Sequence, residues 1–397
     1  MGNFQHAFSE FGKKRITKFE CFHLRSEVPL EYEFPVASFV ENGFLLFKIT
    51  SESGIVGWGE PSPYQENISV VKKEIERIVE PLIIGSSLAN FARTIHSGIE
   101  GLAQFNGIEA GLSQALFDVI GKEAGLSICD LITGQKRKKN LELRAYASGG
   151  MYFDDQPLEL FLKELKEVAG KGFSAWKFRP RMPRGQDHIQ RSKAPPKFDH
   201  DEIRWIVAEA RKIVGDRFDL LIDFGCRLNS LEDAVNLCGR LAPDKFLVVE
   251  EPLTRDPALY QDFRRQVPIK ISGGETLRST AQFYPWLDGA LDLIQPDANL
   301  LPLTHAVDVI TEAGRKDLKY VPHNWTNPVA NSANLQLAGA FSNFVPFVEH
   351  NITFNPIRDD LLISPLRPNG SGNFIVSTKP GLGISLAEQK LEIYMEA

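Results

Sequence analysis

The sequence predicts an α/β protein in which a small α+β module precedes a closed barrel of parallel strands. Two patterns lead to this prediction. Strand-like runs and then helical runs fill roughly the first 135 residues, after which short apolar runs alternate with helical stretches. Polar residues end the later apolar runs at steps of 22 to 27 residues between Asp223 and Glu349. One strand–helix unit of a parallel barrel needs about that length.

The composition excludes several classes of protein. The 397-residue chain has 45 basic and 51 acidic residues, and a net charge of −6 argues against a general nucleic-acid binder. No apolar run reaches the roughly 18 residues that a membrane span needs, and the N-terminus has no hydrophobic signal core. The four cysteines are far apart in the sequence and form no CxxC motif, so we expect reduced thiols and a cytoplasmic protein.

The first module is expected to open with strands and continue with helices. Its three strand-like runs are residues 18–24, 43–49 and 55–60. Residues 51–54 between the last two runs are typical of a hairpin turn. Apolar side chains at helical spacing over residues 70–79 then predict a helix that is stopped by Pro81 and Gly85, and further helices are expected over residues 89–134.

The barrel is expected to contain eight strands separated by helices. The strand-like runs are residues 141–147, 174–178, 220–224, 247–250, 269–272, 293–295, 320–322 and 344–348. A later strand-like run at residues 373–377 is expected to leave the barrel. We therefore divide the chain into an α+β module (1–140), a barrel (141–370) and a C-terminal segment (371–397).

Three carboxylates directly follow apolar strands in consecutive units of this barrel: Asp223, Glu250 and Glu275. The carboxyl ends of neighbouring barrel strands converge on one face, where three acids would repel one another unless a cation met them. Oxygen ligands of this kind suit Mg²⁺. Any one of these acids could cap a helix or form a salt bridge, but three in consecutive units favour a metal site. Glu251 is expected to pair with a base behind the sheet.

An acid and an imidazole end the next two strands. Asp297 beside His323 would fix the tautomer of the ring and raise its basicity, as a general base near neutral pH requires. Taken alone, His323 could equally be a buried structural histidine. Glu349, one unit further along, could donate a hydrogen bond if protonated or could cap a helix.

Two basic residues lie on the second barrel strand. Lys177 and Arg179 flank Phe178, and residues two apart on a strand face the same side. They could hold a substrate carboxylate and balance the negative charge that builds up in a reaction. The alternative is a basic pair that faces solvent.

With these residues, the chain resembles the enolase superfamily and, within it, the mandelate racemase subgroup. The resemblance extends over nearly the whole chain. Its motifs are Gly57-Trp58-Gly59-Glu60, the helix at 109–122, residues 131–134, Lys177-Phe178-Arg179, Asp223, Glu250-Glu251-Pro252, Glu275, Asp297, His323 and Glu349. The muconate-lactonizing subgroup has a lysine at the end of the sixth strand, where this chain reads Gln295-Pro296-Asp297.

The resemblance implies a TIM-like (β/α)7β barrel, an N-terminal α+β capping domain, and a C-terminal segment that returns to the cap. It implies these roles: Mg²⁺ ligands Asp223, Glu250 and Glu275; the acid/base dyad Asp297 and His323; the electrophilic acid Glu349; and the usual Lys-x-Lys pair, here Lys177 and Arg179. The shared chemistry is removal of the proton α to the carboxylate of a small molecule, which gives an enediolate that Mg²⁺ stabilises. A homo-oligomer, dimer or octamer, is also implied.

The arginine in that pair favours one reaction. Arginine stays protonated at ordinary pH, so Arg179 is a poor base, whereas racemisation needs two competent groups. A single group such as His323 can remove the α-proton and then protonate the departing β-hydroxyl. We therefore expect an acid-sugar dehydratase, a hydro-lyase. A racemase or epimerase of a 2-hydroxy acid or amino-acid derivative is the alternative, and a non-catalytic carboxylate-binding relative is a remote one.

Loops around the barrel mouth are expected to set the substrate. The basic insert at residues 180–201 could favour an anionic or diacid substrate, with His188 or His200 entering the site, or it could be a solvated loop. Cap loops at residues 25–39 and 62–68 should also lie over the metal. Their candidate contacts to substrate hydroxyls, which could equally be packing residues, are Tyr32, Tyr64 and Gln65.

Overall fold

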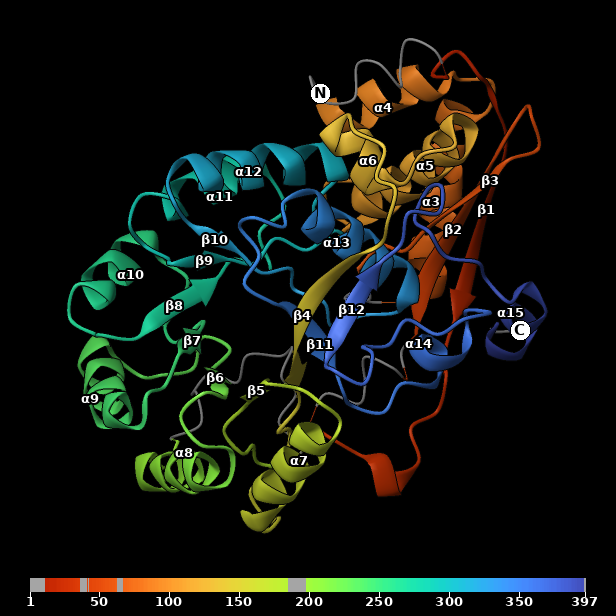
Figure 1. Ribbon diagram of the computed structural model, residues 1–397. Helices are drawn as coiled ribbons and strands as arrows, with labels where there is room; N and C mark the ends of the chain where they lie inside the picture. The colour runs from red at the N-terminus through yellow and green to blue at the C-terminus, as the bar shows by residue number, and fades with distance from the viewer. Residues whose placement is uncertain (1–10, 36–40, 42, 63–66, 185–197, 396–397) are drawn as a thin grey trace.

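The computed structural model describes residues 11–35, 41, 43–62, 67–184 and 198–395 (Figure 1). Within these ranges, the chain forms a three-stranded antiparallel sheet with helices, followed by a larger parallel sheet with helices around it. None of the helices in these ranges is long and apolar enough to cross a membrane.

The N-terminal module, here called the cap, is a sheet covered by helices. Its sheet has the order β1–β2–β3, formed by β1 (Ile16–Leu24), β2 (Phe44–Ser51) and β3 (Val56–Gly59). Its helices are α3 (Ile68–Ile83), α4 (Leu88–Ser97), α5 (Ile108–Ala124) and α6 (Ile128–Thr133), preceded by the short 3-10 helix η2 (Leu30–Tyr32). Helix α5 packs against β2 and β3, and its residues Ile108 to Gly121 are almost all buried.

The parallel sheet forms the barrel. Its strands are β4 (Leu141–Ser148), β5 (Ala175–Phe178), β6 (Asp219–Asp223), β7 (Val248–Glu250), β8 (Lys270–Gly273), β9 (Leu293–Ile294), β10 (Lys319–Tyr320) and β11 (Val348–Asn351). Parallel pairing runs unbroken in the order β10-β9-β8-β7-β6-β5-β4-β11. The two ends of this series are linked through the segment before β11, because the Tyr320 amide of β10 donates to the Phe344 carbonyl at 3.1 Å. The predicted α/β barrel with an α+β cap is confirmed.

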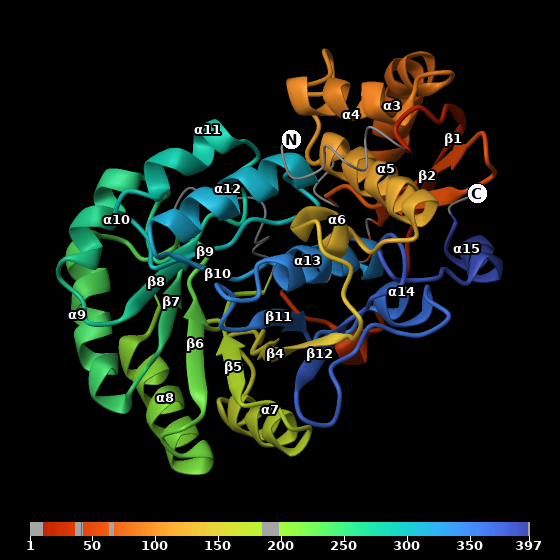
Figure 2. The same ribbon diagram turned by 45° about the horizontal axis from the view of Figure 1, so that its top comes forward.

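Helices lie outside the barrel strands (Figure 2). They are α7 (Glu159–Gly170), α8 (His200–Val214), α9 (Leu231–Leu241), α10 (Pro257–Arg264), α11 (Thr280–Phe283), α12 (Leu303–Arg315), α13 (Pro328–Ala340) and α14 (Pro356–Asp360), with the 3-10 turns η3 (Ala242–Asp244) and η4 (Tyr284–Trp286). Helix α13 is unusual because its polar residues are buried with its apolar ones. It contacts α5 and β3 of the cap, so it lies between the two parts of the molecule.

The last segment leaves the end of the barrel and contacts the cap. Strand β12 (Asn373–Val376) pairs antiparallel with the start of β4 and lies outside the parallel series of the barrel. Beyond it, the Leu382 amide donates to Asp118 of α5 at 2.8 Å. Glu388, the first residue of α15 (Glu388–Tyr394), forms an ion pair with Lys48 at 3.0 Å.

Several predicted boundaries differ from the structure, and two of the differences have a physical cause in the packing. Helix α3 continues past Pro81 to Ile83, which is fully buried, so packing of the last turn outweighs the hydrogen bond that proline removes. The last barrel strand is Val348–Asn351 rather than residues 344–348, and Glu349 therefore lies within the strand instead of after it. An acid is tolerated there because Lys177 neutralises it inside the barrel, at 2.8 Å.

Candidate active site

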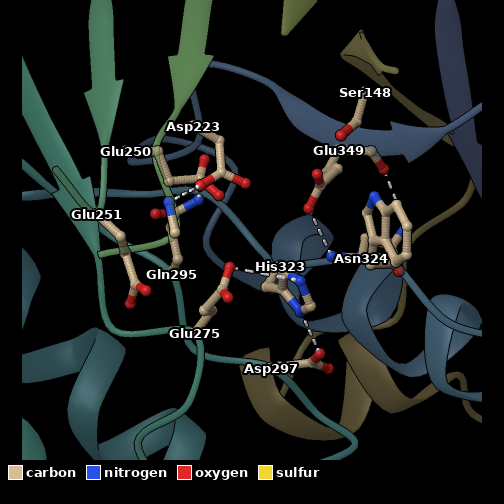
Figure 3. Close-up of polar contacts among 12 residues, drawn as sticks. Ser148, Asp223, Glu250, Glu251, Glu275, Gln295, Asp297, His323, Asn324 and Glu349 are labelled. Carbon is tan, nitrogen blue, oxygen red and sulfur yellow. Dashed lines mark hydrogen bonds and ion pairs between the residues drawn. The ribbon is translucent and has the colours of Figure 1, made fainter. Parts of the chain in front are cut away.

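The three acids predicted as metal ligands lie on neighbouring strands at one end of the barrel. Asp223 and Glu250 are the last residues of β6 and β7, and they are direct neighbours in the parallel register. Glu275 lies two residues beyond the end of β8. Figure 3 shows Asp223 and Glu250 side by side, with Glu275 nearer to His323. The fold therefore brings together three acids that are 27 and 25 residues apart in the sequence.

Each of these acids has a basic partner in this arrangement. Arg179 Nε lies 2.9 Å from Asp223 Oδ2, and Lys177 Nζ lies 2.7 Å from Glu250 Oε1. His323 Nε2 lies 3.5 Å from Glu275 Oε2. Within the described part of the chain, no three histidine, cysteine, aspartate or glutamate side chains already form a metal cluster.

The chemistry of the donor set nevertheless fits a hard divalent cation. Burial raises the pKa of Glu250 to about 8 and that of Glu275 to about 7, and the neighbouring acids add to both shifts. Burial acts the same way on Asp223, but Arg179 and Lys177 outweigh it and lower the pKa of this acid. A divalent cation would favour the ionised form of all three oxygen ligands.

The predicted dyad is present. His323 Nδ1 lies 2.6 Å from Asp297 Oδ2, and both side chains are buried. Burial alone would lower the pKa of the imidazole, but the carboxylates of Glu275 and Asp297 outweigh it and raise this pKa to about 10. The hydrogen bond to Asp297 places the ring proton on Nδ1, so Nε2 is the nitrogen that exchanges protons.

A buried amide holds both members of the dyad. The side-chain nitrogen of Asn334, on α13, donates to Asp297 Oδ1 at 2.9 Å and to the His323 carbonyl at 2.8 Å. Its side-chain oxygen accepts from the Ala298 amide at 2.8 Å. The position of the dyad is therefore set by a helix that contributes no group to the cluster of acids.

Glu349 and Lys177 face each other inside the barrel. Lys177 Nζ lies 2.8 Å from Glu349 Oε1, while Glu349 Oε2 accepts from the Asn324 amide at 3.0 Å. Burial disfavours the ammonium of Lys177, but Glu250 and Glu349 outweigh it and raise its pKa further above its ordinary value. Burial likewise disfavours the carboxylate of Glu349, yet Lys177 and His323 lower its pKa well below the ordinary range. Lys177 is thus a cation and Glu349 an anion in this arrangement, so Glu349 is not poised here as a protonated donor.

Arg179 and Glu251 occupy positions consistent with the sequence analysis. The Arg179 guanidinium lies 5.2 Å from the centre of the Trp325 ring and pairs with Asp223 inside the site, so it is not a solvent-facing base. Glu251 instead binds Arg255, with Oε1 3.0 Å from Nε, and accepts from the Cys226 thiol at 3.1 Å. Figure 3 shows its side chain directed away from Glu250.

The loops over the barrel mouth are partly described. Tyr32 of the first cap loop stacks on Phe354, with ring centres 4.5 Å apart, which is a packing contact between cap and barrel. His200 opens α8 and lies 3.2 Å from Asp233 of α9, so it points to the neighbouring helix and not into the site. Tyr64, Gln65 and His188, the other predicted loop contacts, lie outside the described residues.

Sequence reasoning missed several polar residues of the site. Gln295 donates to Glu250 Oε2 at 2.8 Å, Ser148 accepts from Arg179 Nη1 at 3.3 Å, and Asn334 holds the dyad. One signal was available for Asn334: the run from Pro328 to Ala340 mixes amides with apolar residues at every face of a helix. Such a pattern predicts a buried polar network.

Two family profiles match the chain. The profile described as "Enolase C-terminal domain-like" matches residues 161–390. The profile described as "Mandelate racemase / muconate lactonizing enzyme, N-terminal domain" matches residues 20–133. The two matches follow each other in the chain and cover most of the cap and of the barrel, while residues 134–160, which include β4, lie between them.

Individual relatives are similar over most of their length. Arabinonate dehydratase of Saccharolobus solfataricus is 26% identical over 87% of this chain and 89% of its own. D-gluconate/D-galactonate dehydratase of Picrophilus torridus is 28% identical over 88% and 87% of the two chains. D-galactarolactone cycloisomerase of Agrobacterium fabrum is 27% identical over 95% and 98%.

A solved structure has the same fold. The 3,6-anhydro-D-galactonate cycloisomerase of Zobellia galactanivorans superposes with a TM-score of 0.78 at 22% identity, over 96% of this chain and 100% of that one. At this level of identity, the superposition shows a shared fold.

Proposed function

This chain belongs to the mandelate racemase / muconate lactonizing enzyme family of the enolase superfamily, and we propose that it is an acid-sugar dehydratase. One observation carries the proposal. His323 has its Nδ1 bound to Asp297 at 2.6 Å, while Lys177 and Arg179 are both engaged as cations in ion pairs. Among the residues that the structure describes, the site thus offers one imidazole base, which suits elimination better than the two-base chemistry of a racemase.

The imidazole performs both proton transfers in this proposal. His323 Nε2 takes the proton from the carbon α to the substrate carboxylate, and Asp297 stabilises the imidazolium that forms. The same nitrogen then gives that proton to the β-hydroxyl, which leaves as water while a carbon–carbon double bond forms. The enol product tautomerises to a 2-keto-3-deoxy acid.

The acids and the two cations prepare the substrate for this step. Asp223, Glu250 and Glu275 would hold Mg²⁺, and a bound Mg²⁺ would supply Lewis-acid stabilisation of negative charge on the substrate carboxylate. Arg179 and Lys177 offset the charge of the acids and orient the carboxylate. We assign Glu349 the position beside that carboxylate, through its contact with Lys177.

The substrate class is supported by the relatives. Two of those compared are named as dehydratases of arabinonate, gluconate or galactonate. We therefore propose a polyhydroxy acid as the small-molecule substrate, bound between the cap (1–140) and the barrel (141–370), with residues 371–397 returning to the cap. We further propose a homo-oligomer and, because the four cysteines are free thiols, a cytoplasmic location.

A substrate screen tests the proposal directly. Purified protein with Mg²⁺ is incubated with a panel of aldonic and aldaric acids and one sugar lactone, and the 2-keto-3-deoxy product is measured by semicarbazide absorbance and mass spectrometry. We expect an 18-dalton loss from at least one acid sugar. Incorporation of solvent deuterium at the α-carbon with no keto product would contradict dehydration and indicate an epimerase.

The metal assignment has a matched control in the adjacent glutamate. Glu250→Gln and Glu251→Gln make the same chemical change one residue apart, but only Glu250 belongs to the acid cluster. We expect Mg²⁺ binding measured by calorimetry, and product formation, to be lost in Glu250→Gln and kept in Glu251→Gln. Removal of Mg²⁺ with EDTA should abolish product formation, and added Mg²⁺ should restore it. Equal Mg²⁺ affinity in both variants would contradict the assignment.

A further inference from the structure

Glu60 of the cap is a buried acid that the proposed mechanism does not use. It follows β3 directly, is 0% exposed, and forms no ion pair with any residue that the structure describes. Burial raises its pKa to about 7, despite hydrogen bonds that act the other way. A buried carboxylate without a counter-ion is destabilising unless hydrogen bonds hold it, so its contacts indicate what it does.

Those contacts are hydrogen bonds that the backbone amides at the start of a barrel helix, α13, donate to the Glu60 carboxylate. Glu60 Oε1 accepts from the Asn327 amide at 2.9 Å, and Oε2 accepts from the amides of Val329 and Ala330, each at 3.2 Å. These groups belong to the start of α13, whose own N-cap residue, Asn327, makes no side-chain capping bond. Asn327 Oδ1 instead accepts from Asn355 at 2.9 Å. The cap domain therefore supplies the N-cap of α13.

A second residue of the cap binds the loop that carries Asp297. The Gln114 side chain, on α5, binds the backbone of Glu60 in both directions, accepting from its amide and donating to its carbonyl, each at 2.9 Å. The same side-chain nitrogen donates to the carbonyl of Ala298 at 2.7 Å. Ala298 directly follows Asp297, while Asn327 lies four residues after His323.

These hydrogen bonds form one continuous buried network that connects the cap to the Asp297–His323 dyad. Glu60 holds the start of α13, and Asn334 on the same helix holds both Asp297 and the His323 carbonyl. Gln114 holds the Asp297 loop from the other side. In Figure 2 the cap helices lie against α13, in the position that these bonds require.

We infer that Glu60 is a positioning residue: through α13 and Gln114 it sets the relative placement of Asp297 and His323, so the cap controls the geometry of the base as well as covering the site. This inference rests on the proposed function for its kinetic consequence. The placement itself is a property of the folded protein and can be measured without turnover.

The test compares Glu60→Gln with Asp118→Asn in the full-length protein. Both variants replace a fully buried cap acid that accepts backbone amides with its amide isostere. Asp118, however, accepts from Trp58 and Leu382 and pairs with Lys122 at 2.7 Å, away from the dyad. In Glu60→Gln, an NH₂ group would face amide donors of α13. Three quantities are measured: the melting temperature, kcat and KM on the acid sugar found in the screen, and the low-field proton NMR resonance of His323 Nδ1–H.

We expect kcat to fall at least tenfold in Glu60→Gln with KM changed less than threefold, and the low-field resonance to shift or broaden. Asp118→Asn should lower the melting temperature comparably, while its kcat stays within twofold of wild type and its resonance does not move. An unchanged kcat and resonance in Glu60→Gln would overturn the inference, and so would equal changes in Asp118→Asn.

Two further outcomes keep the inference separate from protein stability and from the proposed function. If Glu60→Gln does not fold, Gln114→Ala, which cuts the link to Ala298, is judged by the same kcat and resonance criteria. If the wild type converts no acid sugar, the proposed function fails. The resonance alone then decides: a shift in Glu60→Gln but not in Asp118→Asn supports the positioning role, and no shift overturns it.

Discussion

At the scale of single residues, the reaction depends on which side chains can exchange a proton. Lys177 and Arg179 lie where a second base would be expected, but the structure engages each of them in ion pairs with acids. Releasing a proton from Lys177 would leave Glu250 and Glu349 without their shared counter-ion in a buried place. Within the described ranges of the chain, this leaves His323 as the group that exchanges the proton. A cation bound by Glu275 would weaken the contact that raises the pKa of the imidazole.

Replacing the imidazole tests this assignment. His323→Asn keeps a polar side chain at the site but removes the proton-accepting nitrogen. We expect kcat on the acid sugar to fall by about 10²- to 10⁴-fold, the usual contribution of a general acid or base. Stopped product assays measure the rate, and circular dichroism with Mg²⁺ calorimetry checks that folding and metal binding persist. Full turnover in the variant would contradict the single-base mechanism.

At the scale of secondary-structure elements, the contact between β3 and α5 positions the cap side of the site. Gly59 lies so close to α5 that a Cβ atom there would be 1.9 Å from the Gly111 carbonyl oxygen. Only a residue without a side chain allows this approach. The approach places the next residue, Glu60, where it reaches α13.

Gly59→Ala should therefore destabilise the protein. The added methyl group meets backbone, which cannot rotate away, so we expect a loss of at least about 1–3 kcal/mol in unfolding free energy, as for overpacked cores. Gly239→Ala, in the exposed part of α9, is the control: its new Cβ meets nothing within 4 Å, so it should stabilise by about 0.5–1 kcal/mol. Urea unfolding measures both variants. A neutral Gly59→Ala would show that β3 and α5 can separate without cost.

At the scale of the whole molecule, stability in acid depends on a histidine of the barrel. His350 on β11 stacks on Phe173, with ring centres 5.9 Å apart, and meets the edge of Phe374. Burial, and then the positive charges of Arg358, Arg367 and Lys171, lower its pKa to about 3, although Glu349 acts the other way. The folded protein therefore keeps this ring neutral in weak acid.

The sign of the pH dependence follows from this difference in pKa. In the unfolded chain the ring binds a proton below about pH 6.5. Stability therefore falls as the pH decreases from about 6.5 towards 3, by up to about 1.4 kcal/mol per pH unit from this group. His350→Phe keeps the aromatic contacts and cannot bind a proton. We expect its unfolding free energy, measured by urea titration from pH 7 to 4, to fall less steeply than that of wild type. Parallel slopes would contradict the prediction.

Much of the site could be predicted from the sequence because most of its residues lie at the end of a strand or within three residues beyond it. An acid after Leu-Val-Val or an imidazole after Val-Pro is recognisable locally, and the spacing of Asp223, Glu250 and Glu275 indicates successive barrel units. The dyad was predicted in the same way, and the structure places its two side chains 2.6 Å apart. Local order along the chain also identified the cap, the barrel and the family.

Only the tertiary structure decided which partners each of these groups has. Glu349 forms an ion pair with Lys177, and Asn334 donates a hydrogen bond to Asp297 of the dyad. Glu60 and Gln114 of the cap form hydrogen bonds with the backbone of the barrel. All of these contacts join segments that are far apart in the sequence. Hydrophobic periodicity reports whether a residue is buried, but hydrogen-bond partners depend on how elements pack in three dimensions. The sequence therefore predicted which side chains carry out the chemistry, whereas the residues that hold those side chains in place were identified only from the tertiary structure.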